Sequence, residues 1–284
     1  MKKIACFVGG GVKGIISAQI VNEIELQTGK PFVSHFDIIS GTSTGSIIAA
    51  MLCEGYSGKD ISKLFYKQAD SIFNSPRNFL RRIYSSKYKL SNLKKILDHY
   101  VPDKQMYEVD KNLMIFSANK KKIAPKVFKS WHKDHITLAD AILSSCAAPT
   151  YFDPYNNLID GGVWANDPSI ETYSEMQKFN KTNDSIKCLT IGTGFNQSSP
   201  SGKGKGFIYW GSNIVPLLMH IQQRRSEYVM DKLLKNNYVK LDPVLVNSST
   251  DMDDASESNL KSLYIDAAKF IHESPEFKKY KQII

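Results

Sequence analysis

A short stretch near the N-terminus, residues 37–50, constrains the fold more than any other part of the chain. It reads DIISGTSTGSIIAA, so β-branched residues are followed by Gly-x-Ser-x-Gly and then by small and apolar residues. Short buried strands favour β-branched residues, and a small apolar run suits a buried helix. Strand, tight turn and helix in this order are the context in which Gly-x-Ser-x-Gly forms a nucleophile elbow.

Ser43 is the candidate nucleophile at the tip of this turn, and Gly41 and Gly45 are the small neighbours that the turn requires. A larger side chain two positions away on either side would strike the adjoining strand or helix. The helix N-terminus behind the serine also favours developing negative charge. The same residues suit an ordinary turn that caps a helix, so the pattern needs support from elsewhere in the chain.

A glycine-rich stretch, GGGVKG at residues 9–14, lies between a predicted strand at residues 3–8 and a predicted helix at residues 15–27. It matches the G-x-G-x-x-G pattern of dinucleotide-binding turns, which also need an acidic residue closing the second strand. The nearby candidate, Asp37, precedes that strand. Bare backbone N–H groups in such a loop can instead stabilise an oxyanion. The serine downstream favours this second use over the first, and over a purely structural turn.

A third motif, LIDGG at residues 158–162, places Asp160 between a short apolar stretch and a glycine pair. Asp-Gly is common in hairpins and loops, which is the structural alternative. As a functional residue, Asp160 would be a general base for the serine hydroxyl. A carboxyl group with an ordinary pKa of about 3.9 is a poor base for a hydroxyl. It can serve only where geometry is fixed and the oxyanion is stabilised at the same moment.

The formal net charge of +9 over 284 residues indicates an anionic partner such as a membrane surface, a nucleotide or a nucleic acid. Residues 65–95 carry eight Lys or Arg, one acidic residue and interleaved aromatic rings. This mixture suits an anionic membrane interface, a phosphate-bearing ligand or single-stranded nucleic acid. A solvated surface with some rings in the core explains it nearly as well. The segment follows the elbow, so we expect a cap beside the active site.

The remaining sequence predicts one α/β domain over residues 1–284, with no internal repeat and no linker. Four separated cysteines without a C-x-x-C pair favour a cytoplasmic protein with reduced thiols. No apolar run approaches the roughly 18 residues of a membrane-spanning helix, so membrane contact would be peripheral. Further strands are expected at residues 112–116, 126–130, 186–191 and 238–241, and further helices at residues 137–146, 207–235 and 260–272. Gly29 is the expected stop of the first helix, and Thr137 the expected cap of the helix that follows it. Residues 120–122 are expected at a hairpin tip, and the polar, acidic residues 248–258 in a loop.

The three motifs together resemble, in order and placement, those of the patatin-like phospholipase family. SSCAAPTYF at residues 144–152 is similar to the helix end that precedes the family's aspartate. Asn166 and Pro168 are similar to the residues that follow its Asp-Gly-Gly. The resemblance covers roughly residues 3–194, and the last third of the chain is much less diagnostic.

The resemblance implies a three-layer α/β/α fold with a central, mainly parallel sheet. It also implies hydrolysis of acyl esters of membrane phospholipids by a Ser43–Asp160 dyad, without a metal or other cofactor. Carried over residue by residue, the oxyanion donors would be two or three of the N–H groups of Gly10, Gly11 and Val12. The other motif positions are Gly9, Gly14, Gly41, Gly45, Gly161 and Gly162. The two histidines that follow Asp160, His220 and His272, lie in helical runs, and we expect neither to complete a triad.

The resemblance further implies a phospholipid substrate that the protein reaches at a membrane surface, peripherally at the inner membrane. Some bacterial members of the family are antiphage effectors switched on by cyclic nucleotides, so a cyclic-nucleotide activator is considered. No nucleic-acid partner is expected, and a homo-oligomer is allowed for. Two alternatives stay open: another serine esterase, thioesterase or acyltransferase with the same machinery, and a non-catalytic nucleotide-binding protein that uses residues 9–14.

Overall fold

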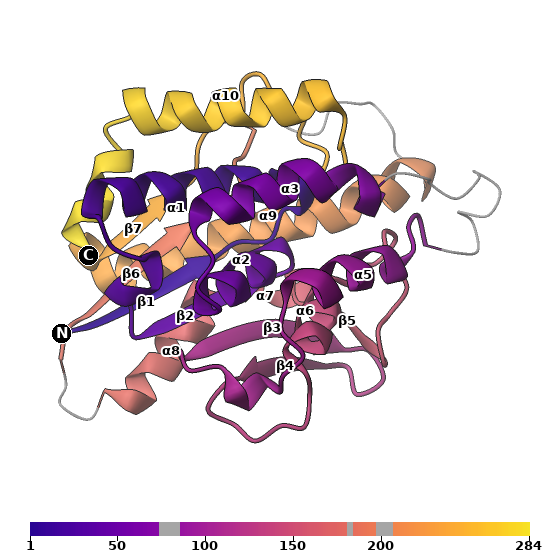
Figure 1. The fold of residues 1–284 in the computed structure, drawn as a ribbon, viewed down its shortest axis with the longest axis horizontal. Coiled ribbons are helices and arrows are strands. Elements are labelled where there is room, and N and C mark those ends of the chain that lie inside the picture. Colours follow the sequence, from indigo (N-terminus) through magenta and orange to yellow (C-terminus); the bar gives the residue numbers. More distant parts are fainter. Residues whose placement is uncertain (74–85, 181–183, 197–206) are drawn as a thin grey trace.

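The computed structural model describes residues 1–73, 86–180, 184–196 and 207–284, and within these ranges a seven-stranded sheet forms the centre of the fold (Figure 1). The strand order is β4-β3-β2-β1-β6-β7, and β5 also pairs with β3. The neighbouring pairs β3-β2, β2-β1, β1-β6 and β6-β7 are parallel, whereas β4 and β5 run antiparallel to β3. The strands are β1 (Lys2–Phe7), β2 (Ile38–Thr42), β3 (Leu113–Asn119), β4 (Ala124–Lys129), β5 (Leu158–Asp160), β6 (Ile186–Ile191) and β7 (Tyr238–Leu241).

Helices cover both faces of the sheet, which confirms the predicted three-layer α/β/α fold. Successive residues of a strand point to opposite faces, so along β1 Phe7 enters the larger core cluster and Cys6 the smaller. The larger cluster packs against α1 (Gly14–Thr28), α2 (Thr44–Cys53), α3 (Gly58–Phe73), α5 (Leu90–Tyr100), α6 (Leu138–Cys146) and α10 (Glu257–Glu273). The smaller packs against α7 (Gly162–Ala165), α8 (Ser169–Phe179) and α9 (Phe207–Leu234). Short 3-10 turns occur at η1 (Gly11–Lys13), η2 (Phe32–His35), η3 (Met106–Glu108), η4 (Lys235–Asn237) and η5 (Phe277–Gln282).

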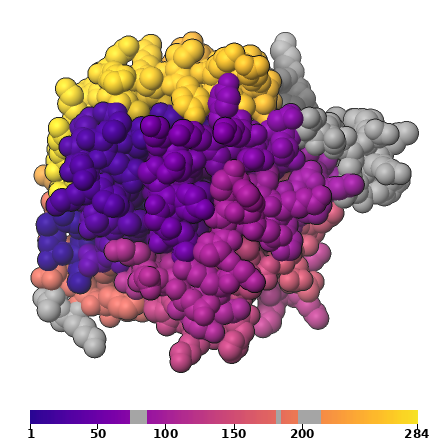
Figure 2. All heavy atoms as spheres, viewed as in Figure 1, coloured from indigo at the N-terminus to yellow at the C-terminus, as the bar shows by residue number. Residues whose placement is uncertain are grey.

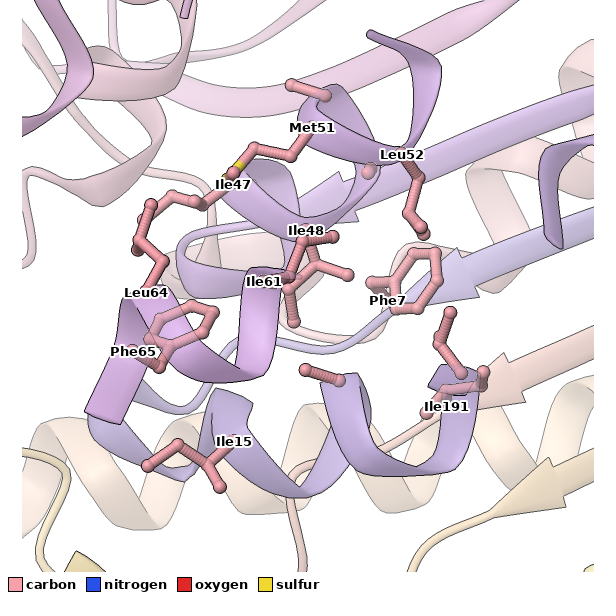
Figure 3. Close-up of a cluster of buried hydrophobic side chains, with 14 of the residues drawn as sticks. Phe7, Ile15, Ile47, Ile48, Met51, Leu52, Ile61, Leu64, Phe65 and Ile191 are labelled. Atoms are coloured by element: carbon pink, nitrogen blue, oxygen red, sulfur yellow. The ribbon is translucent and has the colours of Figure 1, made fainter. Parts of the chain in front are cut away.

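The larger core cluster fixes the elbow helix against the sheet. Figure 3 shows Phe7 of β1, Ile48 of α2 and Ile61 of α3 converging between these elements. All three side chains are completely buried. Burying an aliphatic or aromatic side chain of this size stabilises the fold by about 1.5–3 kcal/mol. The helix that follows Ser43 is therefore held on a rigid base.

The C-terminal helix lies along the N-terminal helices, although the sequence between them is long. Figure 1 draws α10 beside α1, and Figure 2 shows the C-terminal residues packed over the N-terminal ones on this face. Tyr264 of α10 stacks edge-on against Tyr66 of α3, with ring centroids 5.7 Å apart. The Tyr264 hydroxyl also lies 2.7 Å from the Ser62 hydroxyl. The last third of the chain thus closes the same core that carries the motifs.

Most element boundaries agree with the sequence predictions to within about two residues. The predicted cap of α6 is confirmed, because Thr137 Oγ accepts a hydrogen bond from the Asp140 N–H at 3.1 Å. Gly29 ends α1 in the left-handed region with φ 66°, as a C-terminal stop requires. The predicted hairpin around Lys120 is also present, since β3 and β4 pair antiparallel on either side of it.

Two sequence predictions are wrong in detail. The strand expected at residues 112–116 is longer, because β3 continues to Asn119 to pair with both β4 and β5. The closing helix starts at Glu257, within the stretch predicted as a loop, because the Ser256 hydroxyl caps it by accepting the Asn259 N–H. Among the helices in the described ranges, none combines the length and the apolar character needed to cross a bilayer.

Candidate active site

The strand register brings the candidate nucleophile and the candidate base together. Thr42, the last residue of β2, pairs with Phe116 of β3. The next residue of β3, Ser117, pairs with Asp160, the last residue of β5. Strand β4 pairs with one edge of β3. The opposite edge of β3 therefore pairs with both β2 and β5, which meet end to end along it. Neighbouring strand residues are only about 3.3 Å apart, so Ser43, which directly follows β2, lies beside Asp160.

Ser43 is half-buried and has the strained backbone of a nucleophile elbow, with φ 54° and ψ −127°. Such a conformation costs about 1–3 kcal/mol and persists only where its surroundings impose it. Ser145 of α6 contributes to this restraint, because its hydroxyl accepts the Ser43 N–H at 2.9 Å and donates to the Phe116 carbonyl at 2.5 Å. On the other side, the Ser46 hydroxyl donates to the Ser43 carbonyl at 2.6 Å. The serine is thus clamped by hydrogen bonds from two helices.

Replacing Gly45 with alanine should lower the free energy of unfolding by more than about 2 kcal/mol. A Cβ at this position would lie 2.3 Å from the Phe7 carbonyl oxygen, which belongs to the central strand and cannot move aside. Gly55→Ala is the matched control, because it meets no atom within 4 Å and has only the strain of φ 88°. Urea denaturation of both variants measures the difference, and equal losses would contradict the packing argument.

Asp160 is completely buried at the end of β5. Its Oδ1 accepts the Gly162 N–H at 2.7 Å. Burial raises the pKa of the carboxyl group to about 7, against the opposing effects of the Ser43 hydroxyl and the Gly162 N–H. Although the Ser43 hydroxyl is near enough to influence this pKa, Oδ2 has no hydrogen bond of standard geometry to any described residue. Catalytic hydrogen bonds often reach standard geometry only when substrate binds.

The glycine-rich loop between β1 and α1 presents two available backbone donors. The N–H groups of Gly10 and Gly11 donate no hydrogen bond to any residue in the described ranges. The third candidate donor differs, because the Val12 N–H is bonded to the Met252 carbonyl at 2.9 Å. Of the three N–H groups predicted as oxyanion donors, two are therefore without a backbone acceptor among the described residues and one is already bonded.

The chain after Asp160 ties the three motifs to one another. The Ala165 carbonyl accepts the Thr42 hydroxyl of the elbow strand at 2.6 Å. The Asn166 carbonyl accepts the Gly9 N–H of the glycine-rich loop at 3.1 Å. Gly161 lies at the turn between β5 and α7, and Gly14 begins α1. The motif positions predicted from the sequence are thus adjacent in space.

Ser43 and Asp160 line one cavity of about 620 Å³, counting the part that opens to solvent. Apart from the serine, a threonine, Asp160 and backbone of the glycine-rich loop, the walls are apolar and aromatic. They are formed by Val12, Ile47, Phe65, Ala69, Ile72, Phe73, Leu93, Cys146, Ala148, Tyr151, Phe152, Met219 and Met252.

The described residues around this cavity include no histidine. His220 lies on α9 and lines a neighbouring polar pocket, and His272 lies near the exposed end of α10. Neither histidine lines the Ser43 cavity. Among the described residues, the lining of this cavity therefore combines a serine and a carboxyl group with no histidine.

Asp37 lies at the wrong end of the parallel strands for a dinucleotide site. Its carboxylate accepts the Lys3 N–H at 2.8 Å and pairs with the Lys2 ammonium at 3.2 Å, both at the start of β1. The glycine-rich loop follows the opposite end of that strand. A ribose-binding acid must lie at the loop's end of the sheet, so this arrangement disfavours a nucleotide in the loop.

The described parts of the basic and aromatic segment, residues 65–95, lie beside the cavity as a cap would. Phe65, Phe73 and Leu93 line the cavity. Tyr88 is buried and stacks edge-on against Phe73, with centroids 5.3 Å apart. These rings belong to the interior, while residues 74–85, which include three of the predicted basic positions, lie outside the described residues.

Sequence reasoning missed three contributors to the site. Ser145 was noticed only as part of a similar stretch, and its clamp on Ser43 depends on α6 packing beneath the elbow. Met219 and Met252 come from the last third of the chain, where no motif stands out. Apolar residues next to polar loops give no distinctive local signal, so only the tertiary fold could reveal them.

Comparison with known proteins identifies the family that carries these motifs. A model of the patatin-like phospholipase family matches residues 5–172, which span the glycine-rich loop, Ser43 and Asp160. The chain belongs to this family. As a patatin-like phospholipase, it shares the predicted α/β fold and the order of its three motifs.

Its relatives include bacterial and plant proteins. A cGAMP-activated phospholipase of Escherichia coli is 30% identical, over 90% of this chain and 84% of the relative. A cGAMP-activated phospholipase of Pseudomonas aeruginosa is 27% identical, over 82% of this chain and 76% of the relative. Patatin-like protein 4 of Arabidopsis thaliana is also 27% identical, over 90% and 79% of the two chains. The similarity thus extends beyond the matched motifs into the last third of the chain.

Proposed function

We propose that this protein hydrolyses acyl ester bonds of membrane phospholipids with Ser43 as nucleophile and Asp160 as base. The observation that carries the proposal is the common cavity, which a strained serine and a buried carboxylate both line among apolar walls. The free N–H groups of Gly10 and Gly11 belong to the loop that forms its rim. An apolar cavity of this kind favours an acyl chain over a polar substrate.

In the first half of the reaction, Asp160 accepts the hydroxyl proton as Ser43 Oγ attacks the ester carbonyl carbon. The N–H groups of Gly10 and Gly11 stabilise the oxyanion. The bond between carbon and the alcohol oxygen then breaks, and the lysolipid alcohol leaves with the proton from Asp160. In the second half, Asp160 takes a proton from water as the water oxygen attacks the acyl-serine. The fatty acid leaves, and the proton returns to Ser43.

The test combines labelling with product analysis. A fluorophosphonate probe should label Ser43, and purified protein mixed with bacterial lipids should release free fatty acid and lysophospholipid, both identified by mass spectrometry. Transfer of the acyl group to another acceptor, or cleavage of thioesters alone, would favour the acyltransferase or thioesterase alternatives. Nucleotide binding without any serine labelling would favour the non-catalytic alternative.

We also propose that a cyclic nucleotide activates the protein and that the activity serves antiphage defence. The names of the bacterial relatives support this regulation, because two of them are cGAMP-activated phospholipases. The expected result is a rise in fatty-acid release when a cyclic nucleotide from a panel of di- and trinucleotides is added. Equal activity and equal assembly state with every nucleotide would oppose it. We place this single-domain enzyme in the cytoplasm, peripherally at the inner membrane.

A further inference from the structure

Residues 250–253, which we call the strap, cross the glycine-rich loop on their way from β7 to α10. The Met252 carbonyl accepts the Val12 N–H at 2.9 Å, and the Thr250 carbonyl accepts the buried Lys13 ammonium at 3.2 Å. The contact is so close that a Cβ on Gly11 would lie 2.0 Å from the Met252 oxygen. Met252 also lines the Ser43 cavity. The strap therefore occupies one oxyanion donor and part of the substrate space.

A carboxylate at the end of the strap holds it to the cap. Asp253, whose side chain is 9% exposed, forms an ion pair with the Lys87 ammonium and accepts the Tyr88 hydroxyl at 2.6 Å. Hydrogen bonds to a charged acceptor of this kind are stronger than neutral ones. Breaking them removes one of the two anchors of the strap and so weakens its hold on the glycine-rich loop.

The two residues that hold Asp253 form a fixed anion site at the edge of the cavity. Their backbone N–H groups donate to the carbonyls of Thr150 and Tyr151, at 2.9 Å for Lys87 and 2.7 Å for Tyr88. The Lys87 ammonium also lies over the Tyr88 and Tyr151 rings, 5.3 Å and 5.9 Å from their centroids. Because Tyr151 itself lines the Ser43 cavity, the anion site adjoins the substrate space.

We propose that Lys87 and Tyr88 bind a phosphodiester anion, and that the Asp253 carboxylate stands in for this anion in the closed conformation. A phosphodiester offers the same negative oxygens as a carboxylate, and a cation with a hydroxyl donor suits both. When the phosphodiester displaces Asp253, the strap withdraws and the Val12 N–H becomes a third oxyanion donor. The inference rests on the proposed ester hydrolysis. The anion comes from a phospholipid headgroup or from a soluble nucleotide.

The first experiment uses 4-nitrophenyl butyrate, an ester without phosphate. Asp253→Asn and Lys87→Met should each raise its hydrolysis about tenfold, because each breaks a charge-assisted contact. Their double variant should gain no more than either single variant, since both remove the same interaction. Glu257→Gln is the charge-matched control on exposed α10, and its rate should equal the parental rate. Hydrogen exchange in the peptide containing residues 248–256 should rise in Asp253→Asn but not in the control.

The second experiment compares a short-chain phosphatidylcholine with the butyrate ester. The ratio of phospholipid to butyrate hydrolysis should be about tenfold lower in Lys87→Met than in Asp253→Asn, because both variants release the strap but only Lys87→Met loses the charged hydrogen bond to substrate. Stimulation of parental butyrate hydrolysis by a cyclic dinucleotide, absent in Lys87→Met, identifies a soluble anion. No stimulation, together with the lowered ratio, identifies the lipid headgroup. Both outcomes support the site and separate its two sources.

A phospholipid-to-butyrate ratio in Lys87→Met equal to that in Asp253→Asn, without any nucleotide stimulation of the parent, would overturn the anion site. Unchanged butyrate hydrolysis and unchanged exchange in Asp253→Asn would overturn its role in holding the strap closed. Fluorophosphonate labelling of the parental Ser43 keeps these results separate from the proposed reaction. If Ser43 is labelled but Asp253→Asn changes neither butyrate hydrolysis nor hydrogen exchange, only the inference about the strap is rejected. Unlabelled Ser43 in the parent and in both variants rejects the reaction itself.

Discussion

Ser43→Ala is expected to lower phospholipid hydrolysis by at least about a thousandfold, because removing a covalent nucleophile leaves only the oxyanion donors and substrate binding. The side chain is half-buried at the tip of the elbow. The clamps from Ser145 and Ser46 act on the backbone of residue 43 and survive the substitution. Folding should therefore be unaffected.

Fatty-acid release from phospholipid vesicles measures the first effect, and urea denaturation measures the second. Ser258→Ala is a suitable control, because Ser258 is an exposed serine on α10. It should retain parental hydrolysis and parental stability. Hydrolysis at the parental rate in Ser43→Ala would reject Ser43 as the nucleophile, whereas lost hydrolysis with a lowered unfolding midpoint would indicate a structural effect instead.

The fold could be predicted largely from local patterns. Apolar runs identified the buried parallel strands, and capping residues such as Thr137 and Gly29 marked helix ends, because these signals act within a few residues of the chain. The order of the three motifs then pointed to the family. The register of β3 could not be obtained in this way, although it is what places Ser43 beside Asp160. The register in which β3 pairs with β2 and β5 is decided by tertiary packing.

The finer features of the site were also beyond the sequence. Val12 was expected to be an oxyanion donor like its neighbours, but its N–H is bonded to Met252, which lies far away along the chain. The ion pair between Lys87 and Asp253 likewise joins a basic segment to an acidic loop. Charged residues in either stretch look like ordinary solvated surface. Only the approach of the two segments at the cavity gives them a defined role.

Because Asp160 is buried, we expect Asp160→Asn to lower catalytic activity but to raise stability above neutral pH. Activity should fall about 10²–10⁴-fold, because the general base is lost. In the parent protein, labelling of Ser43 by a fluorophosphonate should rise with pH through about 7, since burial raises the pKa of Asp160 to about 7 and only the ionised carboxylate can accept the proton. The residual labelling of Asp160→Asn should lack this rise. Parental labelling rates and an unchanged pH profile in the variant would reject Asp160 as the base.

The free energy of unfolding should be higher in Asp160→Asn than in the parent at pH 8. In the unfolded chain the pKa of an aspartate is about 3.9, so between this value and about 7 the folded protein holds a proton that the unfolded chain releases. The contribution of Asp160 is therefore fully present below pH 4 and is lost as pH rises through 7, on the order of 4 kcal/mol. An asparagine side chain at this position has no charge to bury, so Asp160→Asn should unfold at higher urea than the parent at pH 8 and at a similar concentration at pH 4. A variant that is less stable than the parent at pH 8 would mean that the buried carboxylate stabilises the fold, and would contradict this prediction.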